Sequence, residues 1–396
     1  MADVRPFRAL RPADSLAGEV IAPPYDVLSE AEARMLATPK SFLHITRSEV
    51  DLSPGTDAHS AAAYAKAREN LDFFQDQGWL LEDTDPAYYL YTLKMGTHLQ
   101  SGFLALCSVE EYDNGRIAKH EFTRPDKEDD RVKHMEALDA QVGLVFLAYR
   151  QSDTLAAVIE RSLSIQPLWT VTTDDGVQHT LRRVTANDEI RTAFLRIERL
   201  YIADGHHRSA AASRVHAARQ TEASSTFLAG LFPEDQLQIL AYNRVVHDFN
   251  GKSVDDFIAS VEQTFDLTLG EPRPQRAGQF SMFLGDRWYF LTLKPKVKVP
   301  SDPVSQLDAS VLQDHLLAPI LGIEDPRRSN RITFIGGIRG PEALEQSVRQ
   351  GNAVAFHLFP TSLSQLFAVA DAGQVMPPKS TWFEPKLREG VVSRRL

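Results

Sequence analysis

The chain has 396 residues, of which 43% are hydrophobic and 24% charged, with a formal net charge of -10 at pH 7. These values are ordinary for a globular protein of about two domains, and the acidic balance argues against binding to the phosphate backbone of nucleic acid. No apolar run approaches membrane-spanning length, the N-terminus lacks the apolar core of a signal peptide, and the single cysteine, Cys107, excludes an internal disulfide framework. We therefore expect a cytoplasmic protein with neither nucleic acid nor membrane as a partner.

Residues 1–150 are predicted to form an N-terminal α/β lobe. Its expected elements, in chain order, are a capped helix from Ser29, a helix over 58–78, strands over 87–94 and 101–112, a strand from Arg116 to Phe122, a loop and helix over 125–137, and a buried strand over 142–149. Asn114-Gly115 predicts a type I′ hairpin between the second and third strands. Cys107 lies in an apolar run and is expected to be a small core residue.

The remainder is predicted to contain a core over 151–270 and a C-terminal α/β lobe over 271–396, joined by a proline-rich linker at 271–279. The core is expected to contain a strand over 199–203, a helix over 205–219, strands over 227–232 and 237–246, and a helix over 253–265. The C-terminal lobe is expected to contain a hairpin over 280–293, helices over 303–321, 341–350 and 362–371, and strands over 331–336 and 353–358. The predicted fold class is α+β, a mixed α/β fold in which further α/β lobes accompany the core.

The most informative stretch is the predicted strand-to-helix junction Asp204, Gly205, His206, His207 and Arg208. The aspartate is a good N-cap, and the glycine permits a tight turn and close approach of a ligand to the backbone. The three following residues occupy the first helical turn, where cations are normally disfavoured. Their presence predicts a bound anion such as a phosphate or nucleotide, with Arg208 and the helix amides holding its oxygens. Asp204 is then a candidate base or magnesium ligand.

Two alternatives compete with this phosphate site. The first is a capped helix whose first turn is simply polar. The second is a zinc site, since His206 and His207 are metal-ligand types. Adjacent helical side chains diverge by about 100°, however, so two neighbouring histidines rarely reach one ion.

Further candidates lie in the N-terminal lobe. A rigid Pro-Pro pair presents Tyr25 and Asp26, which is a plausible way to hold a carboxylate in a cleft, although a simple turn fits equally well. His120 and Glu121 end a predicted strand, so their side chains are expected to point to opposite faces. Arg131 is a candidate anion ligand within a charged run that otherwise suggests a solvated face.

Near the C-terminus, a stiff Pro377-Pro378 pair precedes Lys379, Ser380 and Thr381. A lysine and two hydroxyls on a rigid loop are suited to gripping a phosphate. The alternative is a tail that is merely pinned by the aromatic residues after it.

The Pro-Pro-Tyr-Asp-Val, Asp-Gly-His-His-Arg and Met-Pro-Pro-Lys-Ser-Thr motifs together resemble a bacterial and archaeal family of uncharacterised conserved proteins. The Asp204–Arg208 stretch alone also resembles the phosphate-binding motif of the ParB/sulfiredoxin superfamily, which includes an ADP-dependent free-serine kinase. That resemblance implies a ParB/sulfiredoxin-like nucleotide-binding core over 151–270, with Gly205, His206, His207 and Arg208 on the phosphate and Asp204 near the reacting hydroxyl. Sulfiredoxin chemistry needs a cysteine in the motif, which this chain lacks. A basic DNA-binding helical domain is also not evident.

The leading hypothesis is a magnesium-dependent kinase or phosphotransferase that uses ATP or ADP and acts on a small hydroxylated metabolite, with a serine-like compound as one candidate. Asp26 is a substrate-binding or base candidate, Tyr25, His120, Glu121 and Arg131 are candidates for substrate binding, and Lys379 closes the site. A phosphoester hydrolase at the same site and a nucleotide-binding regulator without turnover are the alternatives. The acceptor, the choice between ATP and ADP, and the oligomeric state do not follow from the sequence.

Overall fold

The computed structural model describes residues 2–396 and divides into two compact units. The first unit is Met1–Leu237 together with Pro385–Leu396, and the second is Gln238–Glu384. Helices and strands are interspersed along both units, so the predicted mixed α/β class is confirmed.

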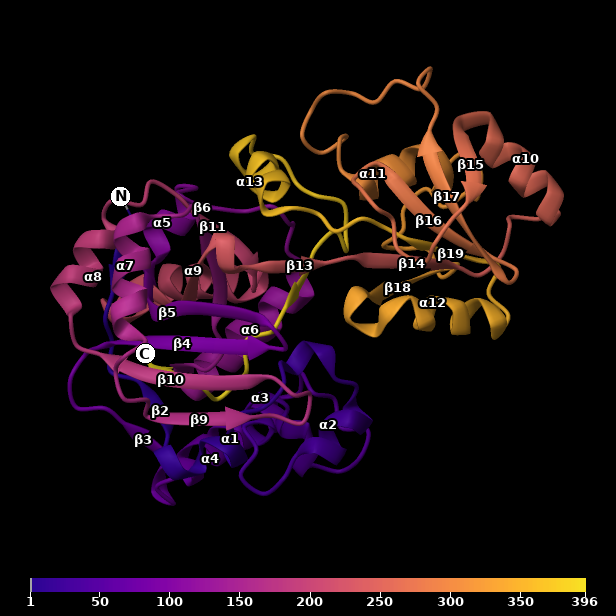
Figure 1. Ribbon diagram of the computed structural model, residues 1–396. Helices are drawn as coiled ribbons and strands as arrows, with labels where there is room; N and C mark the ends of the chain where they lie inside the picture. The colour runs from indigo at the N-terminus through magenta and orange to yellow at the C-terminus, as the bar shows by residue number, and fades with distance from the viewer. Residues whose placement is uncertain (1) are drawn as a thin grey trace. The chain divides into compact units, whose positions relative to one another are not determined.

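The first unit is built around a large mixed sheet (Figure 1). Across the sheet its strands are β6 (Ile117–Ala118), β11 (Leu200–Asp204), β8 (Val145–Tyr149), β12 (Thr226–Pro233), β5 (His98–Ser108), β4 (Tyr88–Met95), β10 (Gln178–Val184) and β9 (Trp169–Thr172), with β1 (Val4–Arg5) also paired to β5. The β11–β6 and β12–β8 pairs are parallel and the others antiparallel. Every residue of β12 is buried, which places the centre of the sheet in the core.

Helices of the first unit are α1 (Ala17–Val20), α2 (Glu30–Leu36), α3 (Leu43–Thr46), α4 (Ala61–Asp76), α5 (Val109–Asp113), α6 (Pro125–Leu138), α7 (Asp153–Ser162), α8 (Asn187–Phe194) and α9 (His206–Arg219). Apolar residues of α7, α8 and α9 share one core with the sheet, and the small side chains of Ala210, Ala211 and Ala212 let α9 pack closely. A separate apolar cluster joins α3, α4 and the end of α6.

Short strand pairs complete this unit: β2 (Leu10–Pro12) with β3 (Leu80–Glu82), and β7 (Ala140–Gln141) with β21 (Arg394–Arg395). The segment Pro385–Leu396 therefore returns to the first unit, and its yellow ribbon reaches the C-terminal label beside the purple and magenta strands (Figure 1). Gln100 donates to the Pro385 carbonyl at 3.3 Å, which anchors the segment on β5.

The second unit has its own antiparallel sheet, flanked by helices. Its strands, in order across the sheet, are β15 (Phe265–Leu269), β17 (Arg287–Leu293), β16 (Gln279–Leu284), β19 (Val354–His357), β14 (Tyr242–Val246) and β18 (Ile332–Gly336), and β13 (Gln238–Leu240) pairs separately with β20 (Trp382–Glu384). The helices are α10 (Val254–Thr264), α11 (Asp308–Leu312), α12 (Gly340–Arg349) and α13 (Leu363–Asp371). A π-helical turn over Gln313–Leu317 follows α11, so the helix expected over 303–321 is shorter and irregular.

The hairpin predicted at Asn114-Gly115 is wrong. The chain instead forms the short helix α5, because Ser108 accepts a hydrogen bond from the Glu111 amide at 3.3 Å and so caps the helix start. The strand expected from Arg116 to Phe122 is limited to β6, whose two residues pair with β11. Cys107 is buried, as predicted.

The domain boundary and the linker expected from the sequence each lie inside one of the two units. The boundary expected at 150–151 lies within the first unit, between β8 and α7. The expected linker over 271–279 lies within the second unit, between β15 and β16.

Candidate functional site

The predicted strand-to-helix junction is present at residues 202–208, but the residues that shape its turn differ from those expected from the sequence. β11 carries a β-bulge between Ile202 and Asp204, which changes the side-chain alternation just before the helix. Gly205 then adopts the left-handed conformation (φ 93°), and a side chain there would meet the Val145 Cα at 3.3 Å. Only glycine combines that backbone conformation with so close an approach.

Asp204 is the last residue of β11 and is not the N-cap of α9, which corrects the sequence-based expectation. The N-cap residue is Gly205, whose amide donates to Asp204 Oδ1 at 2.7 Å. Within residues 2–396, no side chain caps α9, and the amides of His206 and His207 have no hydrogen-bond acceptor. The first turn contains no acidic residue. The helix start therefore offers free donors at its positive end.

Asp204 is paired with Lys386, which comes from the C-terminal segment. The Lys386 ammonium donates to Asp204 Oδ2 at 3.2 Å, and 46% of the Asp204 side chain remains exposed. Burial alone would raise the pKa of Asp204, but the charges of Lys386 and Arg208 hold it well below its ordinary value. Asp204 is thus a fixed anion near neutral pH, suited to orienting other groups and poorly suited to accepting a proton.

Arg208 extends from the first turn of α9 into the body of the unit. Its Nη1 donates to the Leu144 carbonyl at 2.8 Å, and its Nη2 donates to Glu389 Oε1 at 3.1 Å. A side chain at position 143 would meet the Arg208 Nε at 2.8 Å, so Gly143 makes room for the guanidinium. Burial raises the pKa of the Glu389 carboxyl, and Arg208 opposes that rise. Arg208 therefore fastens the C-terminal segment to α9.

Two guanidinium groups lie close to the ring of Tyr25. The Arg131 guanidinium is 4.1 Å and the Arg208 guanidinium 5.2 Å from the centre of its ring, which is cation–π geometry. Arg131 is also paired with Asp130 at 2.6 Å. Asp26, the next residue, is exposed, and its charge acts on Arg208. Three widely separated segments of the sequence thus meet at this point.

A small cavity lies behind these residues. It measures about 40 Å³, and its lining includes Thr46, Arg131, Arg208 and Glu389. That volume suits ordered water.

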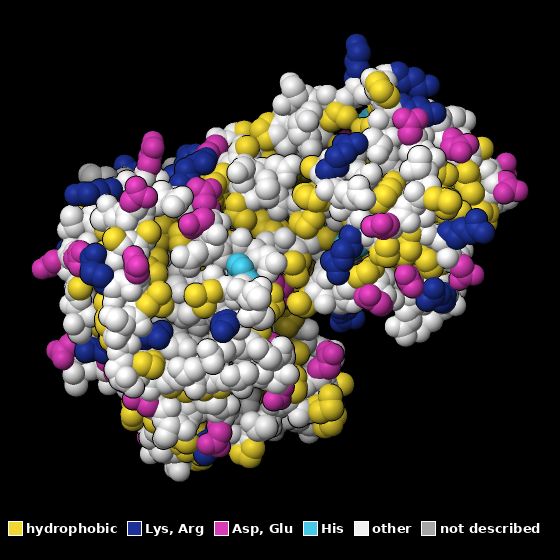
Figure 2. Space-filling model, in the orientation of Figure 1, with side chains coloured by type: hydrophobic (Ala, Val, Ile, Leu, Met, Phe, Trp, Pro, Cys, Tyr) yellow, Lys and Arg dark blue, Asp and Glu magenta, His cyan; other side chains and the backbone are white. Residues whose placement is uncertain are grey.

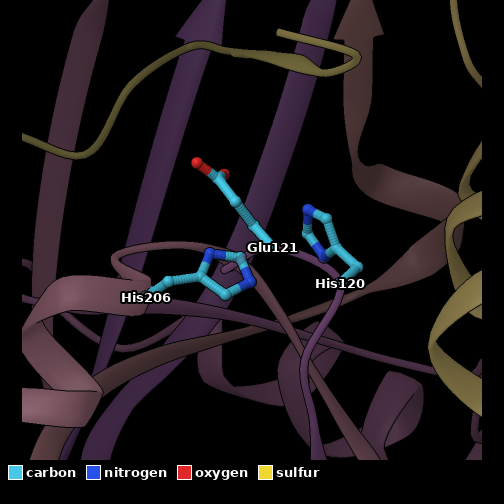
Figure 3. A group of neighbouring side chains, drawn as sticks. All are labelled: His120, Glu121 and His206. Atoms are coloured by element: carbon cyan, nitrogen blue, oxygen red, sulfur yellow. The ribbon is translucent and has the colours of Figure 1, made fainter. Parts of the chain in front are cut away.

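His120, Glu121 and His206 form a compact cluster (Figure 3), with ligand atoms of all three within 4.8 Å of one another. The expectation that His120 and Glu121 point to opposite faces is wrong, because β6 ends at Ala118 and a bend at Glu121 breaks the strand alternation. The two imidazole rings are perpendicular, with centres 4.6 Å apart. Burial lowers the pKa of His120 to about 4, and burial also lowers that of His206, so both rings are neutral at pH 7.

His207 turns in a different direction from His206. The Arg124 amide donates to its Nε2 at 3.1 Å, so the ring proton is on Nδ1. Arg124 is the N-cap residue of α6, and this bond therefore ties the start of α6 to the start of α9. Burial lowers the pKa of His207.

The sequence matches a family model over residues 4–310, described as a protein of unknown function, DUF1015. The chain belongs to this family. A search among curated proteins gives no match. No helix within residues 2–396 has the length and apolarity needed to cross a membrane.

Several solved structures are similar to this DUF1015 chain. A free serine kinase mutant in complex with ADP is 11% identical, with a TM-score of 0.36 over 71% of this chain and 87% of that chain. SbnI with a C-terminal truncation, from Staphylococcus aureus, is 15% identical, with a TM-score of 0.38 over 71% and 82%. A conserved hypothetical protein from Pyrococcus furiosus is 10% identical, with a TM-score of 0.34 over 71% and 90%. These scores are too low to carry an argument about function.

The remaining predicted residues, Lys379, Ser380 and Thr381, belong to the second unit. The Lys379 ammonium lies 5.4 Å from the centre of the Tyr242 ring, and its backbone has a positive φ of 59°. The Ser380 hydroxyl donates to the Pro377 carbonyl at 2.7 Å and closes a local turn. Both the Lys379–Tyr242 contact and the Ser380–Pro377 hydrogen bond join residues of the second unit.

Sequence reasoning missed Lys386 and Glu389, which contact Asp204 and Arg208. Both follow the Lys379–Thr381 loop by only a few residues. The available signal was a charged segment directly after a rigid, proline-rich tail. Its contacts with residues far earlier in the chain follow only from the fold.

Proposed function

We propose that the first unit binds the phosphate groups of ATP or ADP at the start of α9 and transfers a phosphoryl group to the hydroxyl of a small metabolite. One observation carries the proposal: the uncapped start of α9, where the His206 and His207 amides have no acceptor within residues 2–396. Such amides, with the positive end of the helix dipole, favour a phosphate oxygen. Gly205 provides the left-handed turn that joins β11 to this helix start.

Lys386 supplies a cation beside Asp204 at the end of β11. Its ammonium lies 3.2 Å from Asp204 at the edge of the helix start, and its side chain is 21% exposed. A phosphate beside the α9 amides therefore gains a charge-assisted hydrogen bond from Lys386. Arg208 acts differently from the bidentate phosphate ligand expected from the sequence, because Leu144 and Glu389 already engage its Nη atoms. It adds positive potential from behind and holds the junction in place.

Two carboxylates flank this cation-rich region, and their environments separate their roles. Asp204 has a lowered pKa and stays ionised, so it positions Lys386. Asp26 is exposed at the diproline turn and acts on the same Arg208 guanidinium. In the proposed step the acceptor oxygen forms a bond to phosphorus, the bond to the nucleotide oxygen breaks, and Asp26 takes the hydroxyl proton.

The donor groups at Asp204 do not form a resident magnesium site. Its Oδ1 accepts the Gly205 amide and its Oδ2 accepts Lys386, so a cation there competes with an ammonium. Magnesium usually binds through one or two carboxylates together with substrate phosphates. We therefore include Mg²⁺ in assays as the counter-ion of the nucleotide and assign it no protein ligand.

The proposal is tested by phosphorus NMR of the purified protein with Mg²⁺, ATP or ADP, and a pool of hydroxylated metabolites that includes serine. We expect a new phosphomonoester signal, an Asp26→Asn variant slower by about 100-fold, and a Lys386→Met variant with nucleotide affinity about tenfold weaker. Lys40→Met is the matched control, because Lys40 forms a comparable ion pair with Glu19 at 2.8 Å.

Other results would indicate one of the alternative functions or exclude the proposed phosphate site. Free phosphate without a phosphorylated acceptor indicates a phosphoester hydrolase. Nucleotide binding without any product indicates a regulator. No nucleotide binding, or equal binding by the Lys386→Met and Lys40→Met variants, rules out the proposed phosphate site.

A further inference from the structure

We propose that His120, Glu121 and His206 bind a divalent transition-metal ion of the manganese-to-zinc series. Its ligands are side chains, whereas the proposed phosphate site uses backbone amides, among them that of His206, and the metal proposal does not rest on the phosphotransferase proposal. Its residues come from the segment after β6 and from the first residue of α9, so the fold brings them together (Figure 3).

The spacing of the donor atoms fits one ion. The possible ligand atoms of the three residues all lie within 4.8 Å of one another. Zn²⁺ binds nitrogen and oxygen ligands at about 2.0–2.2 Å, which separates neighbouring ligands by roughly 3–3.5 Å. Glu121 is exposed, so a rotation of its side chain can close that gap without disturbing the core.

Two buried ring nitrogens support the assignment. His120 Nδ1 and His206 Nε2 have no hydrogen-bond partner within residues 2–396. The exposed fractions of these residues are only 2% and 5%. Leaving a buried polar atom unpaired costs free energy, and such atoms in native structures call for an explanation. A metal ion satisfies both lone pairs at once.

The unpartnered nitrogen of His120 is Nδ1, so we assign the proton of the neutral ring to Nε2. The Nδ1 lone pair is then available to a metal ion. Metal-binding histidines usually carry the proton on their other ring nitrogen and donate it to a carbonyl or carboxylate.

The donor set selects the class of ion. Two imidazoles and one carboxylate suit zinc, iron, cobalt or manganese, whereas magnesium prefers oxygen ligands alone. Three protein ligands leave at least one position open to water or another ligand. The competing interpretation is that the perpendicular rings of His120 and His206 simply pack against each other.

The test is titration of the full-length, chelator-treated protein with Zn²⁺, followed by calorimetry and by metal analysis after gel filtration. We expect one equivalent of tightly bound Zn²⁺, no comparable binding of Mg²⁺, and affinity at least about 100-fold weaker for Glu121→Gln and His120→Ala. Glu121 is exposed, so its variant is expected to fold. His134→Gln is the control, because His134 is equally buried but its Nε2 is hydrogen-bonded to the Ile45 carbonyl at 3.0 Å.

Cobalt gives a measurement that needs no variant. Co²⁺ bound to two imidazoles and a carboxylate in a site of low coordination number has visible absorption that added Zn²⁺ abolishes. Absence of one equivalent of Zn²⁺, or equal Zn²⁺ affinity for the wild-type protein and Glu121→Gln, overturns the proposal in favour of packed rings. Nucleotide binding measured on the same samples reports separately on the phosphate site.

Discussion

Removing the Lys386 ammonium should weaken the first unit by a measurable and pH-dependent amount. The Lys386–Asp204 pair is 3.2 Å long. Coulomb's law gives about 1.3 kcal/mol for that separation in water and about 5 kcal/mol at an effective dielectric constant of about 20. The Asp204 side chain is 46% exposed, so solvent screening places the pair near the lower figure. After the cost of ordering the lysine, we expect Lys386→Met to lose about 1 kcal/mol at pH 7.

The sign of the pH dependence follows from Asp204. Its pKa in the folded protein lies below the ordinary value, so its contribution to stability is fully present above the unfolded pKa of about 4 and fades as pH falls through the folded pKa. The difference between wild type and Lys386→Met should therefore be constant from pH 5 to 8 and shrink in acid.

Urea denaturation of the single variants Lys386→Met and Asp204→Asn and of the double variant isolates the pair as a double-mutant cycle. Lys40→Met is the surface control, since its partner Glu19 has a side chain that is 56% exposed. A coupling energy below about 0.3 kcal/mol would refute the reasoning.

Three further changes test the junction. Gly205→Ala places a side chain on a left-handed backbone and toward a neighbouring strand. Gly115→Ala carries the same backbone strain of about 1–2 kcal/mol but has open space around it, so urea denaturation should show a larger loss of unfolding free energy for Gly205→Ala. Equal losses would contradict the steric argument. Burial raises the pKa of Glu389, so the folded state holds the carboxyl proton more tightly than the unfolded state does. The stability of the wild type should therefore fall relative to that of Glu389→Gln as pH rises from about 4 toward the raised pKa. A stability difference that is independent of pH would contradict the raised pKa. His207→Ala removes the acceptor of the Arg124 amide and should cost about 1 kcal/mol in the same assay, with protection of the start of α6 lost in amide hydrogen exchange.

Much of the regular structure follows from local sequence. The apolar spacing that predicts a helix over 58–78 reflects α4, whose buried face includes Ala63, Ala67, Leu71 and Phe74. The predicted helix over 205–219 is α9, because a strong run of small helix formers follows a glycine turn. Asn114-Gly115 misled the prediction because hairpin propensity is local and weak, whereas the Ser108 cap and burial of Tyr112 favour a helix there.

The phosphate site could be proposed from the sequence because its residues are consecutive. Asp204 to Arg208 form one strand end and one helical turn, so residue type and local geometry already indicate an anion site. The cluster of His120 with His206 was not accessible, since it depends on where β6 ends and on how the chain bends at Glu121. Side-chain alternation is reliable only while the chain stays in a strand.

The remaining contacts that the sequence did not predict are ion pairs between residues far apart in the chain. Lys386 and Glu389 lie after the whole second unit in the chain, yet they pair with Asp204 and Arg208 in the first. Closing so long a loop costs entropy that two ion pairs alone do not repay, so these pairs depend on the sheet and α9 to bring their residues together. The bond between Arg208 and Glu389 then has a definite role, because a buried guanidinium or a buried carboxylate left alone costs several kcal/mol. The charges at the α9 start are therefore set jointly by a local motif and by a distant segment, and a motif search detects only the first.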